Sequence, residues 1–216
     1  ITGTRADYGL LYWVMKAIEN SSEFNLQLIA TGMHLSSEFG LTYKQIERDG
    51  FKIDKKLEIL VSSDSSTGIS KSMGLAMISF SEAFEDLKPD IIYIGGDIVH
   101  SKTQGISPEL IQCLAWWFTE MAKIAPTHVI LGNHDGLILN KDRQDAITPI
   151  IKALNNPNIY LYKNSGNYEI INHPGFYWNI FSCFDEENWK SVAPTSDGVN
   201  IALYHGAAYG FLTDSD

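Results

Sequence analysis

The sequence predicts a mixed α/β fold whose strands are mainly parallel in the first half of the chain. As far as residue 154, apolar positions at helical spacing alternate with short apolar runs, which is the order of strand–helix–strand units. Beyond Pro157 the runs are β-like and separated by Asn, Gly and Pro turns, which indicates a β-rich end. With 216 residues, 44% of them apolar and 19% charged, the chain can build one large domain or two small ones.

In the first half the pattern predicts a helix, a strand, two helices and a buried strand. Their ranges are 8–19, 26–30, 37–50, 69–87 and 91–94. The second of these helices is expected to begin after Ser37, a common N-cap residue, and to stop at Gly50. The third is expected to end at Lys88, because Pro89 does not continue a helix.

In the second half the pattern predicts two further helices among five strands. The helices are 107–124 and 143–154, and the strands are 128–131, 159–162, 168–171, 176–184 and 199–204. The chain opens as if at the end of a strand and stops at Asp216 without a closing element. We therefore expect further sequence at both ends.

The net charge of −10 arises without any run of Lys or Arg. A basic nucleic-acid-binding surface is therefore not predicted, although bound divalent cations would reverse the local sign. The two cysteines, Cys113 and Cys183, lie in apolar runs without metal-ligand spacing and are expected to be buried thiols. Together with the lack of a signal peptide or a membrane-spanning stretch, they predict a cytoplasmic location and no membrane partner.

Polar residues suited to metal binding follow three of the apolar runs. Asp97 comes after the run at 91–94, the sequence Gly-Asn-His-Asp occupies 132–135, and His205 follows the run at 199–204. A carboxylate can bridge two cations, and an amide oxygen or a neutral imidazole can bind one of them. The simpler alternatives are a helix cap for Asp97, a tight loop for 132–135 and a surface side chain for His205. His128 and His173 are expected to be structural.

The segment Thr-Gly-Thr-Arg-Ala-Asp-Tyr-Gly at 2–9 lies where a first strand meets a first helix. In an open parallel sheet ligands bind at this position, and a helix N-terminus there favours phosphate. Arg5 can grip a phosphate or carboxylate with two hydrogen bonds, with a surface salt bridge as the alternative. His34, after a Gly-Met turn, is expected either to face the site or to be a structural loop residue.

Three motifs in order, at 2–11, 30–36 and 68–76, resemble the hydrolysing UDP-N-acetylglucosamine 2-epimerases. The resemblance covers residues 1–97 and implies a Rossmann-like half in which Arg5, Asp7 and His34 lie near a UDP-sugar. It also implies that Asp97 is the family's catalytic carboxylate. However, Ile98 stands where the family has Arg, and the family's second domain is not present in the sequence.

From residue 88 to 216 the sequence is similar to calcineurin-type metallophosphoesterases. The resemblance rests on Pro-Asp-Ile-Ile-Tyr-Ile-Gly-Gly-Asp-Ile-Val-His at 89–100 and on Val-Ile-Leu-Gly-Asn-His-Asp at 129–135. It implies an αββα sandwich, truncated at its C-terminus and joined to the Rossmann-like half. His100, three residues after Asp97, is similar to the SbcD-type double-strand-break-repair nucleases, which implies DNA as a substrate and an SbcC-type ATPase as a partner.

The resemblance implies a two-metal site. Asp97 would bridge two ions ~3.5–4 Å apart, and Asn133 and His205 would together bind one of the two through oxygen and nitrogen. Mn²⁺ is favoured, because the ligands are both oxygen and nitrogen. The family's opening Asp-x-His and closing Gly-His-x-His are absent from the sequence, so the two-metal site is expected to be incomplete.

The same resemblance implies the catalytic groups. His134, held by Asp135, would stabilise the developing charge or protonate the leaving group, and His100 would lie near the scissile phosphate. Both patterns place a Gly-Asp after a strand, and the strand ending at Asp97 is expected beside the one ending at Thr4. Asp7, with His34, would then replace the missing ligands.

Three functions follow from these observations. The first is metal-dependent phosphodiester hydrolysis of the nuclease type, on DNA or on a smaller phosphoester. The second is the chemistry of a UDP-N-acetylglucosamine 2-epimerase fragment, and the third is a chimeric chain without catalysis.

Overall fold

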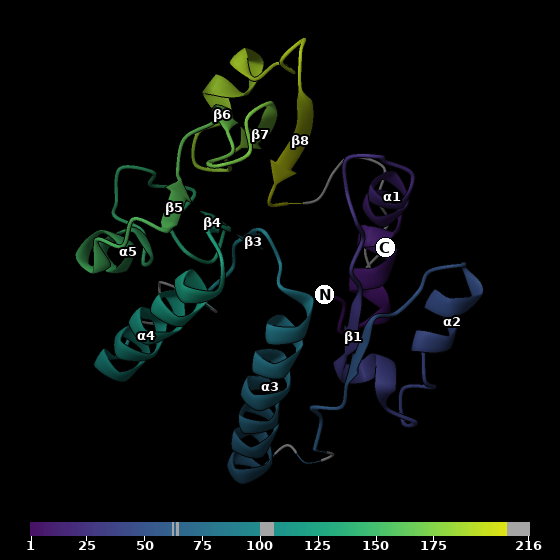
Figure 1. The fold of residues 1–216 in the computed structure, drawn as a ribbon. Coiled ribbons are helices and arrows are strands. Elements are labelled where there is room, and N and C mark those ends of the chain that lie inside the picture. Colours follow the sequence, from purple (N-terminus) through teal and green to yellow (C-terminus); the bar gives the residue numbers. More distant parts are fainter. Residues whose placement is uncertain (62, 64, 100–105, 207–216) are drawn as a thin grey trace. The chain divides into compact units, whose positions relative to one another are not determined.

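A computed structural model of the chain describes residues 1–61, 63, 65–99 and 106–206 (Figure 1). The chain divides into two units, Ile1–Lys88 and Pro89–Asp216, and the division falls at the first residues of the predicted overlap, 88–97. Each unit combines helices with parallel strands, so the predicted mixed α/β class is confirmed. How the two units pair with each other stays a prediction, and each is described by itself below.

The first unit contains a small parallel sheet with helices. Its elements are α1 (Arg5–Glu19), β1 (Ile29–Thr31), η1 (Gly32–Leu35), α2 (Tyr43–Arg48), β2 (Lys55–Leu57) and α3 (Ser66–Leu87). β1 pairs in parallel with β2, and Thr2 forms a parallel bridge to Ala30 on the other side. The core of this unit joins α1 to the sheet and to α2. It contains Tyr8, Met15, Leu28, Ala30, Ile46 and Phe51.

Helix α1 begins at a complete capping box. The hydroxyl of Thr4 accepts a hydrogen bond from the backbone N–H of Asp7 at 3.2 Å. The carboxylate of Asp7 accepts in return from the backbone N–H of Thr4 at 3.0 Å and of Gly3 at 3.1 Å. These bonds satisfy N–H groups that a helix leaves without partners, so the helix begins three residues earlier than its apolar stripe predicts.

The predicted helix over 37–50 is wrong in its first half. Gly40 and Leu41 have positive φ angles of 81° and 51°, a conformation that ends a right-handed helix. The chain forms the short helix η1 before this point and α2 after it. The strand predicted over 26–30 is regular only from Ile29. Helix α3 agrees with its prediction at the C-terminal end, where Lys88 adopts a left-handed conformation before Pro89.

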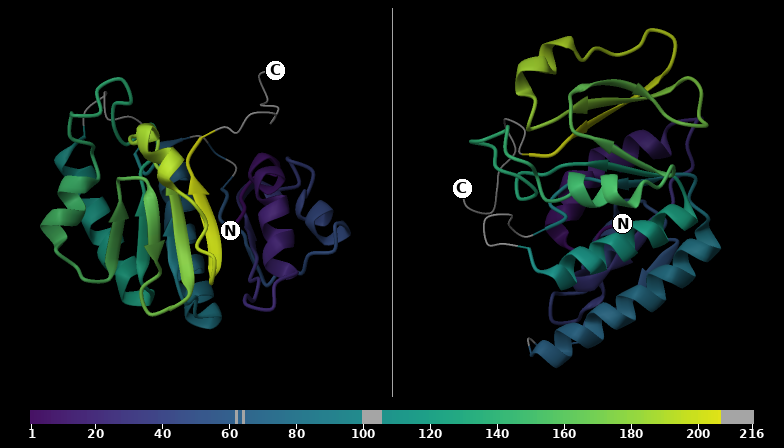
Figure 2. Two further views of the ribbon diagram at one scale, coloured as in Figure 1. Left: turned by 90° about the horizontal axis from the view of Figure 1, so that it is seen from above. Right: turned by 90° about the vertical axis from the view of Figure 1, so that its left-hand side faces the viewer.

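The second unit contains two three-stranded sheets. β3 (Ile92–Ile94), β4 (Thr127–Ile130) and β5 (Ile159–Tyr162) form a parallel sheet in the order β3-β4-β5. β6 (Gly166–Glu169), β7 (Phe176–Phe181) and β8 (Val199–Tyr204) form the other, in which β6 is antiparallel and β8 parallel to β7. Helices α4 (Pro108–Ile124) and α5 (Thr148–Leu154) complete the unit (Figure 2).

Alternating side chains of β4 define the layers of this unit. Val129 packs into a cluster with α4 and α5, whereas its neighbour Ile130 packs against Trp178 and Ile180 of β7. Helices thus cover one face of the first sheet, and the second sheet covers the other. The outer face of the second sheet carries the 3-10 helix η3 (Glu186–Ser191), so the described chain has no regular α-helix in the place of the predicted fourth layer.

Three sequence predictions for this unit are corrected by the structure. The helix predicted from 143 begins only at Thr148, because Asp145 accepts hydrogen bonds from the first backbone N–H groups ahead of Pro149. The strand predicted over 168–171 is β6, two residues earlier. Cys113 is exposed on α4, whereas Cys183 is buried as expected. In the described part of the chain, no helix has the length and apolar character that crossing a membrane requires.

Candidate functional site

Three of the predicted site residues lie together in the second unit. Asp97 follows β3, Asn133 follows β4 and His205 follows β8. Nε2 of His205 lies 3.1 Å from Oδ1 of Asn133 and 3.2 Å from Oδ2 of Asp97. The ends of three separate strands thus bring a carboxylate, an amide oxygen and an imidazole to one point.

Two glycines make this close approach feasible. Gly96 has a φ of 93°, and a Cβ atom placed on it would lie 2.8 Å from Nδ1 of His205. A Cβ atom on Gly132 would lie 2.8 Å from Cε1 of the same ring. An added Cβ atom would come still closer to the facing loop, to Gly132 from position 96 and to Asp97 from position 132, so both positions favour glycine for reasons that belong to the site.

Backbone groups orient the side chains of the site. Oδ1 of Asp97 accepts a hydrogen bond from the backbone N–H of His134 at 2.9 Å, which leaves Oδ2 directed at His205. Nδ1 of His205 donates to the backbone oxygen of Gly95 at 2.6 Å. A neutral His205 therefore turns the lone pair of Nε2 toward the other two side chains.

The arrangement fits a divalent cation. With Nδ1 protonated, the Nε2 lone pair of neutral His205 faces two oxygen atoms that also carry lone pairs, and a cation between them would satisfy all three. Ligands bound at about 2.0–2.2 Å lie roughly 3 Å apart around an ion, close to the separations seen here. Metal-binding histidines also commonly donate their other N–H to a backbone carbonyl, as His205 does. Mixed oxygen and nitrogen donors suit a first-row divalent metal.

Only one ion's ligands are identified. Within residues 1–61, 63, 65–99 and 106–206 there is no group of three His, Cys, Asp or Glu side chains placed to hold a metal. The candidate site contains just two such residues, with Asn133 as the third donor. The predicted incompleteness of a two-metal site follows from the absent sequence motifs, and His100 lies outside the described residues.

Asp135 braces the loops that carry the site. Its fully buried carboxylate accepts hydrogen bonds from the backbone N–H of Gly132 at 2.8 Å and of Val99 at 3.0 Å. Burial raises the pKa of this carboxyl group, although the backbone donors oppose the shift. Asp135 therefore ties the loop after β3 to the loop after β4, while its predicted contact with the His134 ring stays a prediction.

The three candidate residues of the first unit differ in their exposure and in their hydrogen-bond partners. Arg5 is exposed in the first turn of α1, and the carboxylate of Asp7 belongs to the capping box. His34 is fully buried, and its ring nitrogens lie 2.9 Å from the hydroxyl of Thr2 and 2.7 Å from that of Thr42. Burial lowers the pKa of His34, which favours the structural alternative for this residue. The predicted approach of Asp7 to Asp97 stays a prediction.

Asp145 is a buried polar residue near the site that was not predicted from the sequence. This buried residue accepts from Thr148 at the start of α5 and forms an ion pair with Lys163 at 3.1 Å. One local feature of the sequence could have indicated it: an Asp shortly before a Thr-Pro pair is typical of a helix start. Its distant partner gave no signal, because 18 residues separate the two in the chain.

Comparison with known proteins finds two families along the chain. The family model for the calcineurin-like phosphoesterases matches residues 75–215, and that for UDP-N-acetylglucosamine 2-epimerase matches residues 16–104. The predicted resemblance to both families is thereby confirmed.

Three curated relatives each match part of the chain. A GDP/UDP-N,N'-diacetylbacillosamine 2-epimerase (hydrolyzing) of Campylobacter jejuni is 53% identical over 97 residues, 45% of this chain and 25% of the relative. A UDP-N,N'-diacetylbacillosamine 2-epimerase (hydrolyzing) of Legionella pneumophila is 35% identical over 45% of this chain and 26% of the relative. An uncharacterized protein, R555, of Acanthamoeba polyphaga mimivirus is 35% identical over 135 residues, 57% of this chain and 10% of the relative.

The chain spans about a quarter of the length of these epimerases and a tenth of the mimivirus protein. The phosphoesterase model, in contrast, matches more than half of this chain and includes Asp97, Asn133 and His205. The chain therefore belongs to the calcineurin-like phosphoesterase family.

Proposed function

We propose that the second unit hydrolyses phosphodiesters with the help of a divalent metal. The observation that carries this proposal is the convergence of Asp97, Asn133 and His205, whose donor atoms meet at 3.1 and 3.2 Å. Calcineurin-like phosphoesterases typically use divalent metals. A metal bound to these three residues would supply Lewis-acid polarisation of the phosphate.

The side chains around the convergence have distinct tasks in this proposal. Asp97, Asn133 and His205 hold the ion, and the backbone N–H of His134 fixes the rotation of the Asp97 carboxylate. The exposed imidazole of His134 donates a proton to the leaving oxygen. Asp135 keeps the loop rigid, which preserves the alignment that transfer of the proton needs.

Mn²⁺ is the proposed metal, since it accepts both oxygen and nitrogen ligands. The proposed substrates are phosphodiesters, including DNA, although the net charge of −10 gives the chain no basic field of its own. A partner such as an SbcC-type ATPase would supply that field in a nuclease complex. The free cysteines support the further proposal that the protein is cytoplasmic.

The test is a Mn²⁺ titration followed by thermal unfolding of the full chain, its Asp97→Asn variant and an Asp142→Asn control. Asp142 is an exposed carboxylate of the same unit and is not one of the three converging donors. A ligand that binds only the folded state stabilises by roughly 2.7 kcal/mol at a hundredfold excess over its dissociation constant. We expect this stabilisation in the wild type and the control, and its loss in Asp97→Asn.

Hydrolysis of bis(p-nitrophenyl) phosphate then separates binding from catalysis. Turnover that requires Mn²⁺, stops with chelator and falls in Asp97→Asn and His134→Ala supports the proposal. A wild-type chain that binds no Mn²⁺ contradicts it, and binding without turnover favours the catalytically inactive hybrid.

A second candidate function is binding of a UDP-sugar by the first unit. The 53% identity to a hydrolysing epimerase and the exposed Arg5 beside the N-terminus of α1 favour it. The corresponding test is thermal unfolding with UDP-N-acetylglucosamine in the presence of chelator. A shift that Arg5→Ala removes would support this function, and no shift in the wild type would contradict it.

A further inference from the structure

We propose that Asp145 and Lys163 are positioning residues that set the geometry of the loop carrying Asn133. The inference rests on the proposed function, because its consequence for binding concerns the metal held by Asp97, Asn133 and His205. Neither residue touches that convergence, so both would act through the backbone between them and the site.

Asp145 is a buried carboxylate, and both of its oxygens accept hydrogen bonds. Its Oδ1 accepts from the backbone N–H of Ile147 at 3.0 Å and of Thr148 at 2.6 Å. Its Oδ2 accepts from the Thr148 hydroxyl at 2.7 Å and from the ammonium of Lys163 at 3.1 Å. The Asp145 side chain is 2% exposed, against 37% for that of Lys163. Burial would raise the pKa of Asp145, but Thr148 and Lys163 outweigh it and lower the pKa, so the carboxylate stays charged.

The segment that carries Asp145 is bonded directly to the site loop. The backbone N–H of Ala146 donates to the backbone oxygen of Asp135 at 2.8 Å. A Cβ atom on Gly136 would lie 3.4 Å from Cβ of Asp145 and 2.7 Å from the ring of Phe184, so this turn is held between the two. A shift of Asp145 would therefore move the backbone of 135–136.

Asp135 connects the backbone at 135–136 to the proposed metal-binding residues. Its carboxylate binds the backbone N–H groups of Gly132 and Val99, which lie next to Asn133 and close to Asp97 in the chain. A series of side-chain and backbone hydrogen bonds thus connects Lys163 through Asp145, Ala146 and Asp135 to both loops. Such partners behind the ligands hold the ligands in the geometry that a metal requires.

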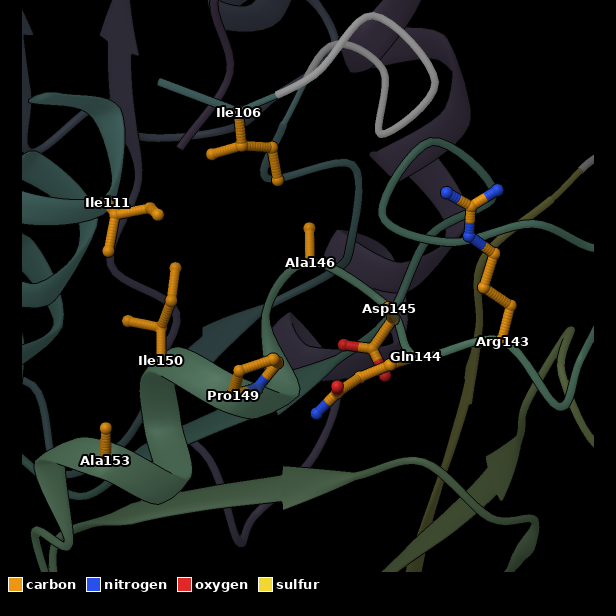
Figure 3. A pocket seen from close by; sticks show the side chains of 9 residues that line it. All are labelled: Ile106, Ile111, Arg143, Gln144, Asp145, Ala146, Pro149, Ile150 and Ala153. Carbon is orange, nitrogen blue, oxygen red and sulfur yellow. The ribbon is translucent and has the colours of Figure 1, made fainter. Parts of the chain in front are cut away.

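Both packing and polar bonds hold the segment around Asp145. On one side it borders an open, largely apolar hollow of about 490 Å³, whose lining includes Ile106, Ile111, Ala146 and Ile150 (Figure 3). Figure 3 shows Asp145 on the strip of chain between Arg143 and the start of α5. Ala146 and Ile147 of this strip belong to the core of the unit, and the polar bonds of Asp145 hold the strip on the side of the hollow.

Removal of Lys163 tests the proposal, because it leaves a buried carboxylate without its cation. Lys163→Met should weaken Mn²⁺ binding about tenfold at a temperature well below unfolding, the lower end of the usual effect of outer-shell partners. Lys163→Arg should restore the wild-type dissociation constant. Lys123→Met removes a lysine from an exposed ion pair with Glu120 and should leave it unchanged.

A second measurement needs no metal. In the metal-free full chain, the backbone N–H of Gly132 should exchange with solvent about tenfold faster in Lys163→Met than in wild type. The N–H of Ile94 within β3 should keep its rate, and Lys163→Arg should restore that of Gly132.

The outcomes separate this inference from the proposed function. Faster exchange at Gly132 with weaker binding supports both. A wild type that binds no Mn²⁺ contradicts the proposed function, and the exchange rate of Gly132 then still decides whether Lys163 positions the loop. A Lys163→Met variant that only melts earlier, with unchanged exchange at Gly132 and unchanged Mn²⁺ affinity, overturns the inference.

Discussion

The side-chain oxygen of Asn133 lies 3.1 Å from Nε2 of His205, although 72 residues separate the two in the chain. β4 and β8, which carry these residues at their ends, belong to different sheets of the second unit. The two sheets pack through Ile130 and Leu203, so the core that joins them also sets the distance across the site. Geometry at the site is therefore linked to the stability of the fold.

Asn133→Ala should abolish tight Mn²⁺ binding without unfolding the protein. The variant removes one of three donors, and we expect a loss on the order of a hundredfold in affinity, since outer-shell partners alone contribute 10–100-fold. Isothermal titration with Mn²⁺ measures this, with Asn140→Ala, an exposed asparagine of the same unit, as the control. Equal affinities in the two variants would show that Asn133 is not a ligand.

The sequence predicted this convergence because each member follows an apolar strand. Asp97 and Asn133 come after adjacent parallel strands, whose carboxyl ends meet at one edge of a sheet. His205 follows β8, which lies in the other sheet, so its arrival depends on how the two sheets pack. The apolar run at 199–204 singled out His205, but only the family resemblance implied that it meets the other two, since strand patterns alone do not give sheet packing.

Other features depended on tertiary structure that no local pattern shows. Gly40 reads as a tolerable residue within a helical stripe, yet its positive φ interrupts the helix predicted over 37–50. Cys113 lies in an apolar run, but it faces outward because Leu114 and Phe118 take the buried face of α4. Asp145 and Lys163 meet only in the folded unit, so neither drew attention in the sequence.

Gly132→Ala and Gly9→Ala should have opposite effects on stability. A Cβ atom on Gly132 would press against Asp97 and His205, and we expect a loss of about 1–3 kcal/mol, as for other overpacked sites. Gly9 is an exposed position of α1 with open space around it, so alanine there should add about 0.5–1 kcal/mol. Chemical unfolding of the variants measures both changes. A Gly132→Ala variant as stable as the wild type would show that Asp97 and His205 leave room for a Cβ atom at this position.

His128 should make the second unit sensitive to acid. The ring is fully buried, its Nδ1 accepts from the Trp178 indole at 3.1 Å, and its Nε2 has no hydrogen-bond partner among the described residues. Burial, with a smaller contribution from His173, lowers the pKa of His128 to about 4. A neutral side chain is therefore required in the folded protein.

The lowered pKa determines the direction in which stability changes with pH. The unfolded chain takes up a proton near pH 6.5 and the folded chain only near 4, so stability falls as the pH drops through this window. At 1.36 kcal/mol per pH unit the loss amounts to about 3 kcal/mol. Unfolding midpoints at pH 7 and pH 4.5 measure it. His128→Asn keeps an acceptor for Trp178 and should reduce this part of the pH dependence, whereas an unchanged pH profile would assign the effect to other groups.

Asp7→Ala tests two roles of one side chain, as a helix cap and as a replacement metal ligand. Loss of the capping box should destabilise the first unit by about 1 kcal/mol, because the N–H groups of Gly3 and Thr4 lose their acceptor. If Asp7 also replaces a missing metal ligand, Mn²⁺ affinity should fall in the same variant. Unfolding measured with chelator reports the first role, and titration below the unfolding temperature reports the second. A destabilised variant with unchanged Mn²⁺ affinity would leave Asp7 as a helix cap only, with one ion's ligands supplied by Asp97, Asn133 and His205.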